Sequence, residues 1–125
     1  MGELIDYFFD TYALYEIIMG NKDYNKFSEK IGIITTKLNL MELHYTLLLD
    51  FGIDIANKYY NKFIGFTVDI DDETIIISNQ FRASMKKRKM SYVDCLGYTI
   101  AKIRGVKFLT GDKEFFDLNN VEFVK

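Results

Sequence analysis

The chain has 125 residues, enough for one domain that buries roughly two thirds of its unfolded surface around a single core. It carries 16 Lys and Arg against 18 Asp and Glu, and the net charge of -2 excludes a nucleic-acid binder that relies on overall positive charge. The single Cys and single His exclude an internal disulfide and the usual structural zinc site, so oxygen atoms are the expected ligands of any metal.

Two further features bear on location and domain organisation. No run approaches the ~20 apolar residues of a membrane span, and the N-terminus lacks the basic region and cleavage site of a signal peptide. We therefore expect a cytoplasmic protein without membrane contact. The sequence contains no linker, repeat or low-complexity stretch, so residues 1–125 are expected to form a single domain.

The N-terminal third alternates between short apolar runs and helical patterns. An apolar run of strand type over residues 5–9 ends in an acid, Asp10, and a helical pattern continues from there to about residue 19. Residues 22–30 are typical of a second, mostly solvated helix, and residues 32–35 of a short strand.

The middle of the chain is predicted to contain two consecutive helices, at 37–51 and 53–63, and then a strand at 66–70. The first of these helices has a stripe of apolar residues at helical spacing that is expected to face the core. The stripe consists of Leu38, Met41, Tyr45 and Leu48.

The C-terminal half is predicted to contain helices at 73–88 and 91–104, strands at 106–110 and 121–124, and a short helical turn through Phe116. Short apolar strands that alternate with helices indicate a mainly parallel sheet covered on both faces. The expected fold class is therefore α/β, a three-layer α/β/α sandwich with a sheet of about five strands.

Two acids follow predicted strands directly. Asp10 ends the first strand, and Asp112 comes after the strand at 106–110. If these strands are neighbours, both carboxylates emerge at the carboxyl edge of the sheet, where ligands bind in open α/β folds. The alternative is that each acid only caps the helix or turn that follows it.

Asp94 is a third acid with two interpretations. It lies three residues after Ser91 at the start of a helix, which is typical of a capping box. On the helix surface, however, it shares a stripe with the small residues Gly97 and Ala101, so this face permits close approach of another element. A buried acid on such a face usually has a partner or a metal.

Glu42 lies about two turns into its helix, too far for a cap, and shares a polar stripe with Asn39 and Thr46. That stripe is either a solvated helix edge or part of a site.

These acids occur within a series of short motifs that runs through the whole chain. The series resembles a PIN-domain ribonuclease, and it is most similar to the VapC-type toxins of prokaryotic toxin-antitoxin pairs. The motifs are Asp10-Thr11-Tyr12-Ala13-Leu14, Asn39-Leu40-Met41-Glu42-Leu43, Ser91-Tyr92-Val93-Asp94-Cys95 and Phe108-Leu109-Thr110-Gly111-Asp112.

The resemblance implies an active site and a reaction. The acids of the family fall on Asp10, Glu42, Asp94 and Asp112, and its hydroxyl before the last acid falls on Thr110. Asp10, Asp94 and Asp112 are expected to hold Mg²⁺ or Mn²⁺, ions that prefer oxygen ligands, and Glu42 either to join them as a ligand or to orient the water. The implied activity is endoribonuclease cleavage, that is, hydrolysis of RNA phosphodiester bonds by a metal-activated water. The implied partners are an RNA substrate, a cognate antitoxin and a second copy in a homodimer.

Two other functions are compatible with parts of the sequence. One is a catalytically silent PIN-like module that binds RNA or protein. The other is a phosphoryl-accepting receiver domain with Asp69 as acceptor, although the acid pair and the C-terminal Lys of such domains are missing.

Four remaining features also have an interpretation from the sequence. The basic run at residues 86–89 is either a solvated helix end or a contact for RNA phosphates. His44 is expected in the packed core and Cys95 as a small buried hydrophobe. Asp117 is expected at the surface, or else as a supporting ligand near the site.

Overall fold

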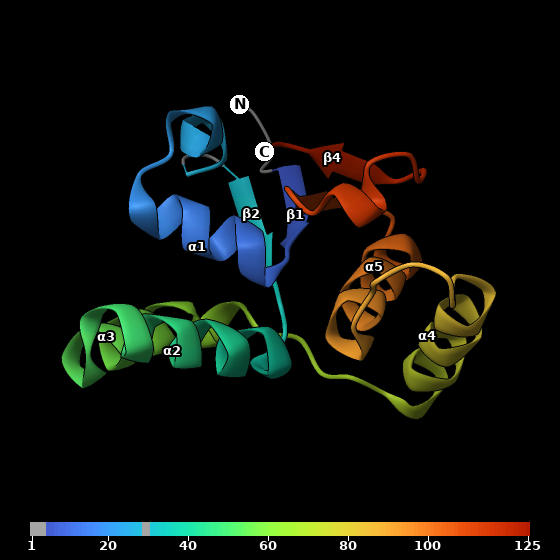
Figure 1. Ribbon diagram of the computed structural model, residues 1–125. Coiled ribbons are helices and arrows are strands. Elements are labelled where there is room, and N and C mark those ends of the chain that lie inside the picture. Colours follow the sequence, from blue (N-terminus) through green and yellow to red (C-terminus); the bar gives the residue numbers. More distant parts are fainter. Residues whose placement is uncertain (1–4, 29–30) are drawn as a thin grey trace.

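The computed structural model of the protein describes residues 5–28 and 31–125. Four strands form one sheet in the order β2-β1-β3-β4, and every neighbouring pair is parallel (Figure 1). The strands are β1 (Ile5–Phe9), β2 (Ile31–Ile34), β3 (Lys107–Thr110) and β4 (Val121–Phe123). The predicted parallel sheet is confirmed, with four strands in these residues where about five were expected.

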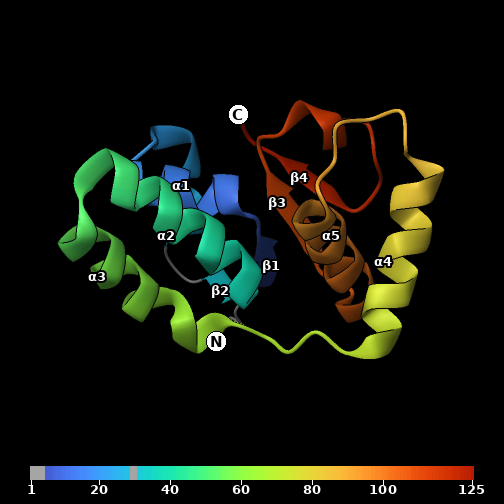
Figure 2. The same cartoon turned by 60° about the horizontal axis from the view of Figure 1, so that its bottom comes forward.

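Helices cover both faces of the sheet, as predicted. Figure 2 shows α1, α2 and α3 on one side of the strands and α4 and α5 on the other. The α-helices are α1 (Thr11–Met19), α2 (Lys37–Phe51), α3 (Ile53–Phe63), α4 (Asp72–Ser84) and α5 (Tyr92–Arg104). The 3₁₀ helices are η1 (Lys22–Phe27), η2 (Ile64–Phe66) and η3 (Lys113–Phe115). Over the described ranges, none of the helices is long and apolar enough to cross a membrane.

The two central strands supply side chains to two separate cores. Because side chains alternate along a strand, Phe8 and Phe108 point to one face, and Phe9 and Leu109 point to the other. All four are completely buried. This double burial explains why two consecutive residues are large and apolar in each strand, Phe8-Phe9 in β1 and Phe108-Leu109 in β3.

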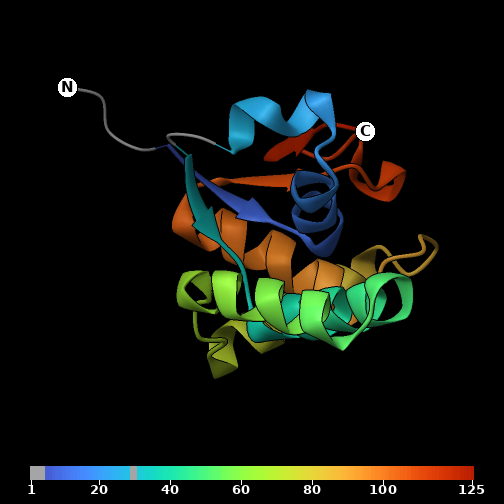
Figure 3. The same cartoon turned by 90° about the vertical axis from the view of Figure 1, so that its left-hand side faces the viewer.

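Helix α5 approaches the sheet very closely at Gly97. A Cβ atom at this position would lie 2.6 Å from Phe8 Cε1 and 3.0 Å from Phe108 Cε1. Figure 3 shows α5, in orange, directly against the central strands. The close approach predicted for the face that carries Asp94 is therefore present.

The predicted core-facing stripe of α2 was wrong. Met41, Tyr45 and Leu48 are exposed, and Leu38 is only half-buried. The residues that face the core are Leu40, Leu43 and Leu47. Helix α2 carries large apolar residues on two faces, so their spacing predicts a helix without deciding which face the sheet covers.

The predicted strand at 66–70 was also wrong. Phe66 ends η2, and the only strand-like feature described in this segment is a single bridge between Thr67 and Thr35. Asp69 therefore does not lie at the end of a central strand, and the receiver-domain alternative loses its phosphate acceptor.

Two predicted helices are shorter than expected. Helix α4 ends at Ser84 instead of residue 88, and η1 replaces the expected helix at 22–30, whose last two residues lie outside the described ranges. As expected, η1 is mostly solvated, but Tyr24 and Phe27 anchor it in the core. The remaining predicted helices occur where expected.

Candidate active site

Neighbouring strands bring two of the predicted acids to the same edge of the sheet. Strands β1 and β3 pair in parallel, with Phe9 opposite Leu109, so both chains leave the sheet side by side. Asp10 follows β1 at once, and its backbone N–H donates to the Leu109 carbonyl at 3.2 Å. Asp112 lies two residues beyond the end of β3.

Asp10 is the most buried of the acids, with 3% of its surface exposed. Its Oδ1 accepts a hydrogen bond from the Ala13 N–H at 2.7 Å, which caps α1, and its Oδ2 accepts one from the Thr110 hydroxyl. Burial raises the pKa of Asp10 to about 8 despite these bonds, and the charges of Asp94 and Asp112 act in the same direction.

Thr110 connects Asp10 to Asp112. It is completely buried, and its Oγ1 accepts a hydrogen bond from the Asp112 N–H at 3.0 Å while its proton goes to Asp10. One hydroxyl thus fixes the relative position of the two acids that leave the sheet.

Asp94 and Asp112 both cap helices, and each uses only one oxygen to do so. Asp94 Oδ2 accepts from the Ser91 N–H at 3.1 Å in a complete capping box, and Asp112 Oδ1 accepts from the Glu114 N–H at 3.0 Å. Burial raises the pKa of Asp94, the hydrogen bonds from Ser91 lower it, and the Asp112 charge raises it. The capping interpretations were therefore correct, but they do not exclude a second role.

Glu42 lies on α2 and is hydrogen-bonded to Thr11, the residue after Asp10. Its Oε1 accepts a hydrogen bond from the Thr11 hydroxyl at 2.6 Å. Burial raises the pKa of Glu42, the bond from Thr11 opposes the shift, and the charge of Asp94 adds to it. Glu42 is therefore within electrostatic range of Asp94.

A hollow of about 360 Å³ brings three of the four acids together. It is lined by Asp10, Asp94 and Asp112, together with Tyr12, Gly111, Lys113 and Lys125. Glu42 is not among the lining residues. The sequence analysis assigned no role to Lys113 and Lys125, because neither stands next to other basic residues in the sequence.

The chemistry of these acids fits a hard divalent cation. No Lys or Arg in the described part of the chain forms an ion pair with any of the four. Burial together with the charges of neighbouring acids raises the pKa of Asp10, Asp94 and Glu42 and so disfavours their charged forms. Oxygen-only ligands that lack a compensating cation suit Mg²⁺ or Mn²⁺. The described residues contain no group of three or more Asp, Glu, His or Cys side chains already arranged as a metal cage.

The other singled-out residues lie away from this hollow. Asp117 is exposed and pairs with Arg88 at 2.7 Å, which places it at the surface as expected. Cys95 is completely buried, also as expected.

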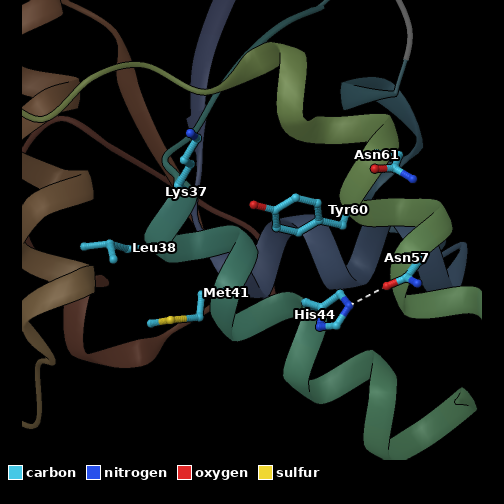
Figure 4. Close-up of a pocket in the computed structure, with 7 residues that line it drawn as sticks. All are labelled: Lys37, Leu38, Met41, His44, Asn57, Tyr60 and Asn61. Atoms are coloured by element: carbon cyan, nitrogen blue, oxygen red, sulfur yellow. Dashed lines mark hydrogen bonds between the residues drawn. The ribbon is translucent and has the colours of Figure 1, made fainter. Parts of the chain in front are cut away.

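The expectation of a core position for His44 was wrong. His44 is half-buried between α2 and α3, where its Nε2 lies 2.8 Å from Asn57 Oδ1 and its ring meets the edge of Tyr60 (Figure 4). It lines a pocket of about 550 Å³ with Lys37, Leu38, Met41, Asn57, Tyr60 and Asn61. This pocket is larger than the acidic hollow but contains no carboxylate, so it cannot supply the chemistry predicted from the acids.

Among known protein families, the one described as PIN domain matches residues 7–121 of this sequence. A search of curated proteins gives no match to this sequence.

Several solved structures are similar to the whole chain. VapC20 of Mycobacterium tuberculosis, described as a sarcin-ricin loop cleaving toxin, has a TM-score of 0.77 and 13% identity over 94% of this chain and 96% of that one. DNA-bound VapBC of Salmonella typhimurium has a TM-score of 0.73 and 19% identity over 97% and 98%. A toxin-antitoxin complex from Klebsiella pneumoniae has a TM-score of 0.71 and 16% identity over 92% and 94%. At these identities the likeness demonstrates a shared fold.

Proposed function

Since the chain belongs to the PIN domain family, we propose that it is a metal-dependent endoribonuclease, the toxin of a toxin-antitoxin pair. One observation carries the proposal: Asp10, Asp94 and Asp112 line a single hollow at the carboxyl edge of β1 and β3. Three acids from three separate parts of the sequence do not converge for helix capping, which each could perform alone.

We assign metal binding to Asp94, Asp112, Glu42 and Asp10. Asp94, Asp112 and Glu42 each retain an oxygen that accepts no hydrogen bond from other described residues, and none of these oxygens is buried. When bound, Mg²⁺ or Mn²⁺ would supply an activated water and offset the negative charge that develops on the scissile phosphate. Thr110 holds Asp10 and Asp112 in register through its hydroxyl.

The lysines of the hollow suit the substrate of this reaction. Lys113 and Lys125 lie beside the acids without an ion pair to any of them among the described residues, so their charges are available for RNA phosphates. The protein would thus bind the RNA backbone next to the acids that act on it.

The expected protein partners follow from the likeness to toxin-antitoxin complexes. A cognate antitoxin that places a basic side chain among uncompensated carboxylates would neutralise them and block the site. A homodimer is also part of this proposal.

A cleavage assay with matched variants tests the activity. Asp94→Asn keeps an oxygen that accepts from the Ser91 N–H, so the capping box and the fold should persist while metal binding fails. Asp71→Asn is the control, because Asp71 caps α4 through Thr74 and is not one of the acids at the hollow. We expect Mg²⁺-dependent cleavage of total RNA by the wild type and by Asp71→Asn, with new 5′ ends identified by sequencing.

The outcomes separate the candidate functions. Cleavage by Asp94→Asn equal to that of the wild type would remove Asp94 from the site. Folded wild-type protein that binds RNA in Mg²⁺ or Mn²⁺ without cutting it would favour the catalytically silent module. A further test is the melting temperature, which Mn²⁺ should raise for the wild type and not for Asp94→Asn.

A further inference from the structure

A chain of hydrogen bonds connects the start of α2 to Glu42. The Thr36 hydroxyl donates to Asn39 Oδ1 at 2.6 Å, the Asn39 amide donates to Thr11 Oγ1 at 3.1 Å, and the Thr11 hydroxyl donates to Glu42 Oε1 at 2.6 Å. Every donor in this series of hydrogen bonds points toward the Glu42 carboxylate. Thr36 and Asn39 are each only 1% exposed, so water does not compete for the bond between them, and the two bonds at Thr11 are partly buried.

The orientation of the Asn39 amide follows from its neighbours. An ionised Glu42 carboxylate can only accept, so the Thr11 proton is directed to Oε1 at 2.6 Å and Thr11 Oγ1 is left to accept from Asn39. The amide nitrogen must therefore face Thr11, and Oδ1 must face Thr36. The Thr36 hydroxyl suits this orientation, because it donates to Oδ1 while its oxygen accepts the Asn39 backbone N–H at 3.2 Å as the cap of α2.

Helix capping does not account for this arrangement. Helix α5 also begins with a hydroxyl residue and a polar residue three positions later, and there the Asp94 carboxylate turns back to the Ser91 N–H. In α2 the side chain at the same position, Asn39, instead extends across to Thr11 at the start of α1. Both helix starts have a hydroxyl residue that accepts the N–H three residues later, but only α5 completes a capping box. The contact of Asn39 with Thr11 adds nothing to the cap of α2 and requires another explanation.

We propose that Asn39 is a positioning residue: through Thr11 it holds the Glu42 carboxylate in the orientation that the metal-dependent cleavage proposed above requires. Glu42 projects from a half-exposed helix position with three rotatable bonds, and one hydrogen bond at Oε1 selects among its conformers. Its other oxygen is left for the metal. Residues that orient a metal ligand in this way typically contribute about 10- to 100-fold to metal affinity or activity.

Asn39→Asp separates positioning from capping. An acid three residues after the cap suits the N-terminus of a helix, so a residue needed only for capping would tolerate the change. Aspartate cannot donate to Thr11, and Thr11 would then donate to the new carboxylate instead of Glu42. We expect a cooperative thermal transition as in the wild type, Mn²⁺ affinity reduced about 10-fold or more by calorimetry, and kcat lowered about 10- to 100-fold with little change in KM for RNA.

Substitutions at Thr11 provide a second test in case the buried aspartate impairs folding. Thr11→Val keeps the shape and removes the donor, whereas Thr11→Ser keeps the donor. We expect Val to weaken Mn²⁺ binding as Asn39→Asp does, and Ser to restore it. Thr46→Val is the control, because the Thr46 hydroxyl donates to the backbone carbonyl of Glu42 at 3.2 Å and not to its carboxylate.

Each outcome distinguishes this inference from the proposed function. A wild type that neither binds Mn²⁺ nor cleaves RNA would overturn both. A wild type that does both, together with a Thr11→Val variant that does both equally well, would overturn only the positioning role. A Thr11→Ser variant as impaired as Thr11→Val would also overturn it, because the methyl group rather than the hydroxyl would then matter.

Discussion

At the residue scale, a carboxylate that caps a helix with one oxygen keeps its second oxygen for another contact. Asp94 and Asp112 each satisfy a backbone N–H with one oxygen, and the other oxygen accepts no hydrogen bond from the described residues. Asp10 differs, because Ala13 occupies one of its oxygens and Thr110 the other. Capping and metal binding are therefore compatible for Asp94 and Asp112, whereas Asp10 would have to share its oxygens with the metal.

The burial of Asp10 predicts how the stability of the metal-free protein depends on pH. Its pKa is about 8 in the fold, well above that of an unfolded aspartate, so the native state holds this proton where the unfolded chain has lost it. The proton on Asp10 therefore contributes stability to the folded state, in full below about pH 4. This contribution, on the order of 5 kcal/mol, is lost as the pH rises to about 8.

Asp10→Asn should remove most of this dependence. In EDTA, we expect the melting temperature of the wild type to fall more steeply between pH 5 and pH 8 than that of the variant, so that the variant is the more stable protein at pH 8. The Asn side chain can still accept from the Ala13 N–H, so the cap of α1 is retained. Parallel melting curves for the two proteins would contradict the assigned pKa.

Sequence patterns and the family resemblance predicted the acids of the candidate site and the orienting hydroxyl of Thr110, but not the contact of Asn39 with Thr11. Asp10, Asp94 and Asp112 follow local signals, namely strand ends and helix starts, that are visible within a few residues. The contact between Asn39 and Thr11 joins residues 28 positions apart, and it depends on how α1 and α2 pack. The one signal in the sequence was the stripe that Asn39 shares with Glu42, which became informative only with the neighbouring helix in place.

At the element scale, the contact between α5 and the sheet fixes the position of Asp94. Gly97→Ala should gain about 1 kcal/mol in helix propensity, yet the added methyl would lie 2.6 Å from the buried ring of Phe8. We expect the overpacking to dominate and to lower the free energy of unfolding by about 1–3 kcal/mol in urea titrations. Gly65→Ala is the control, since a Cβ atom added there would have no other atom within 4 Å; equal effects at both glycines would contradict the close packing.

The segment after α4 places basic side chains next to the start of α5. Arg82, Lys86 and Arg88 line a hollow of about 410 Å³ that also includes Met90, the residue before the N-cap Ser91. Arg88 is occupied by Asp117, but Lys86 and Lys87 are exposed and have no ion pair among the residues described. The RNA-phosphate interpretation of this basic run is therefore open to a direct test.

Neutralising these lysines should weaken RNA binding in a salt-dependent way. For the double variant Lys86→Gln, Lys87→Gln, we expect the slope of log affinity against log salt to fall by about 1.4, measured in EDTA to prevent cleavage. Lys58→Gln, Lys62→Gln on α3 is the control with the same change in charge. If both pairs lower the slope equally, the run at residues 86–89 acts only through net charge.

The predictions at this scale failed where one pattern fitted two structures. The apolar residues of α2 define two possible core faces, and the sheet covers the face with Leu40, Leu43 and Leu47. Residues 66–70 alternate like a strand, yet only Thr67 bridges to the chain at Thr35. Both decisions depend on which neighbouring element is present, and local spacing does not contain that information.

At the scale of the whole molecule, the acids come from both helical layers. Glu42 lies on α2 on one side of the sheet, Asp94 lies on α5 on the other side, and Asp10 and Asp112 follow the central strands between them. The parallel order of the strands predicted only that Asp10 and Asp112 lie side by side, and the family resemblance implied that Asp94 and Glu42 join them. A cation held by all four acids would connect the two layers at the edge of the sheet.

This arrangement predicts how Mg²⁺ changes amide hydrogen exchange across the molecule. Because a ligand that binds only the folded state stabilises it by RT ln(1 + [L]/Kd), amides that exchange through global unfolding should slow about 100-fold at 100 times the Kd. We expect additional protection at residues 10–14, 39–43, 92–96 and 110–114, which belong to both layers, and little local change in α3. Asp94→Asn should abolish the effect. Protection confined to the segments of one layer would mean that the metal does not join α2 to α5, and Glu42 or Asp94 would then have to be removed from the ligand set.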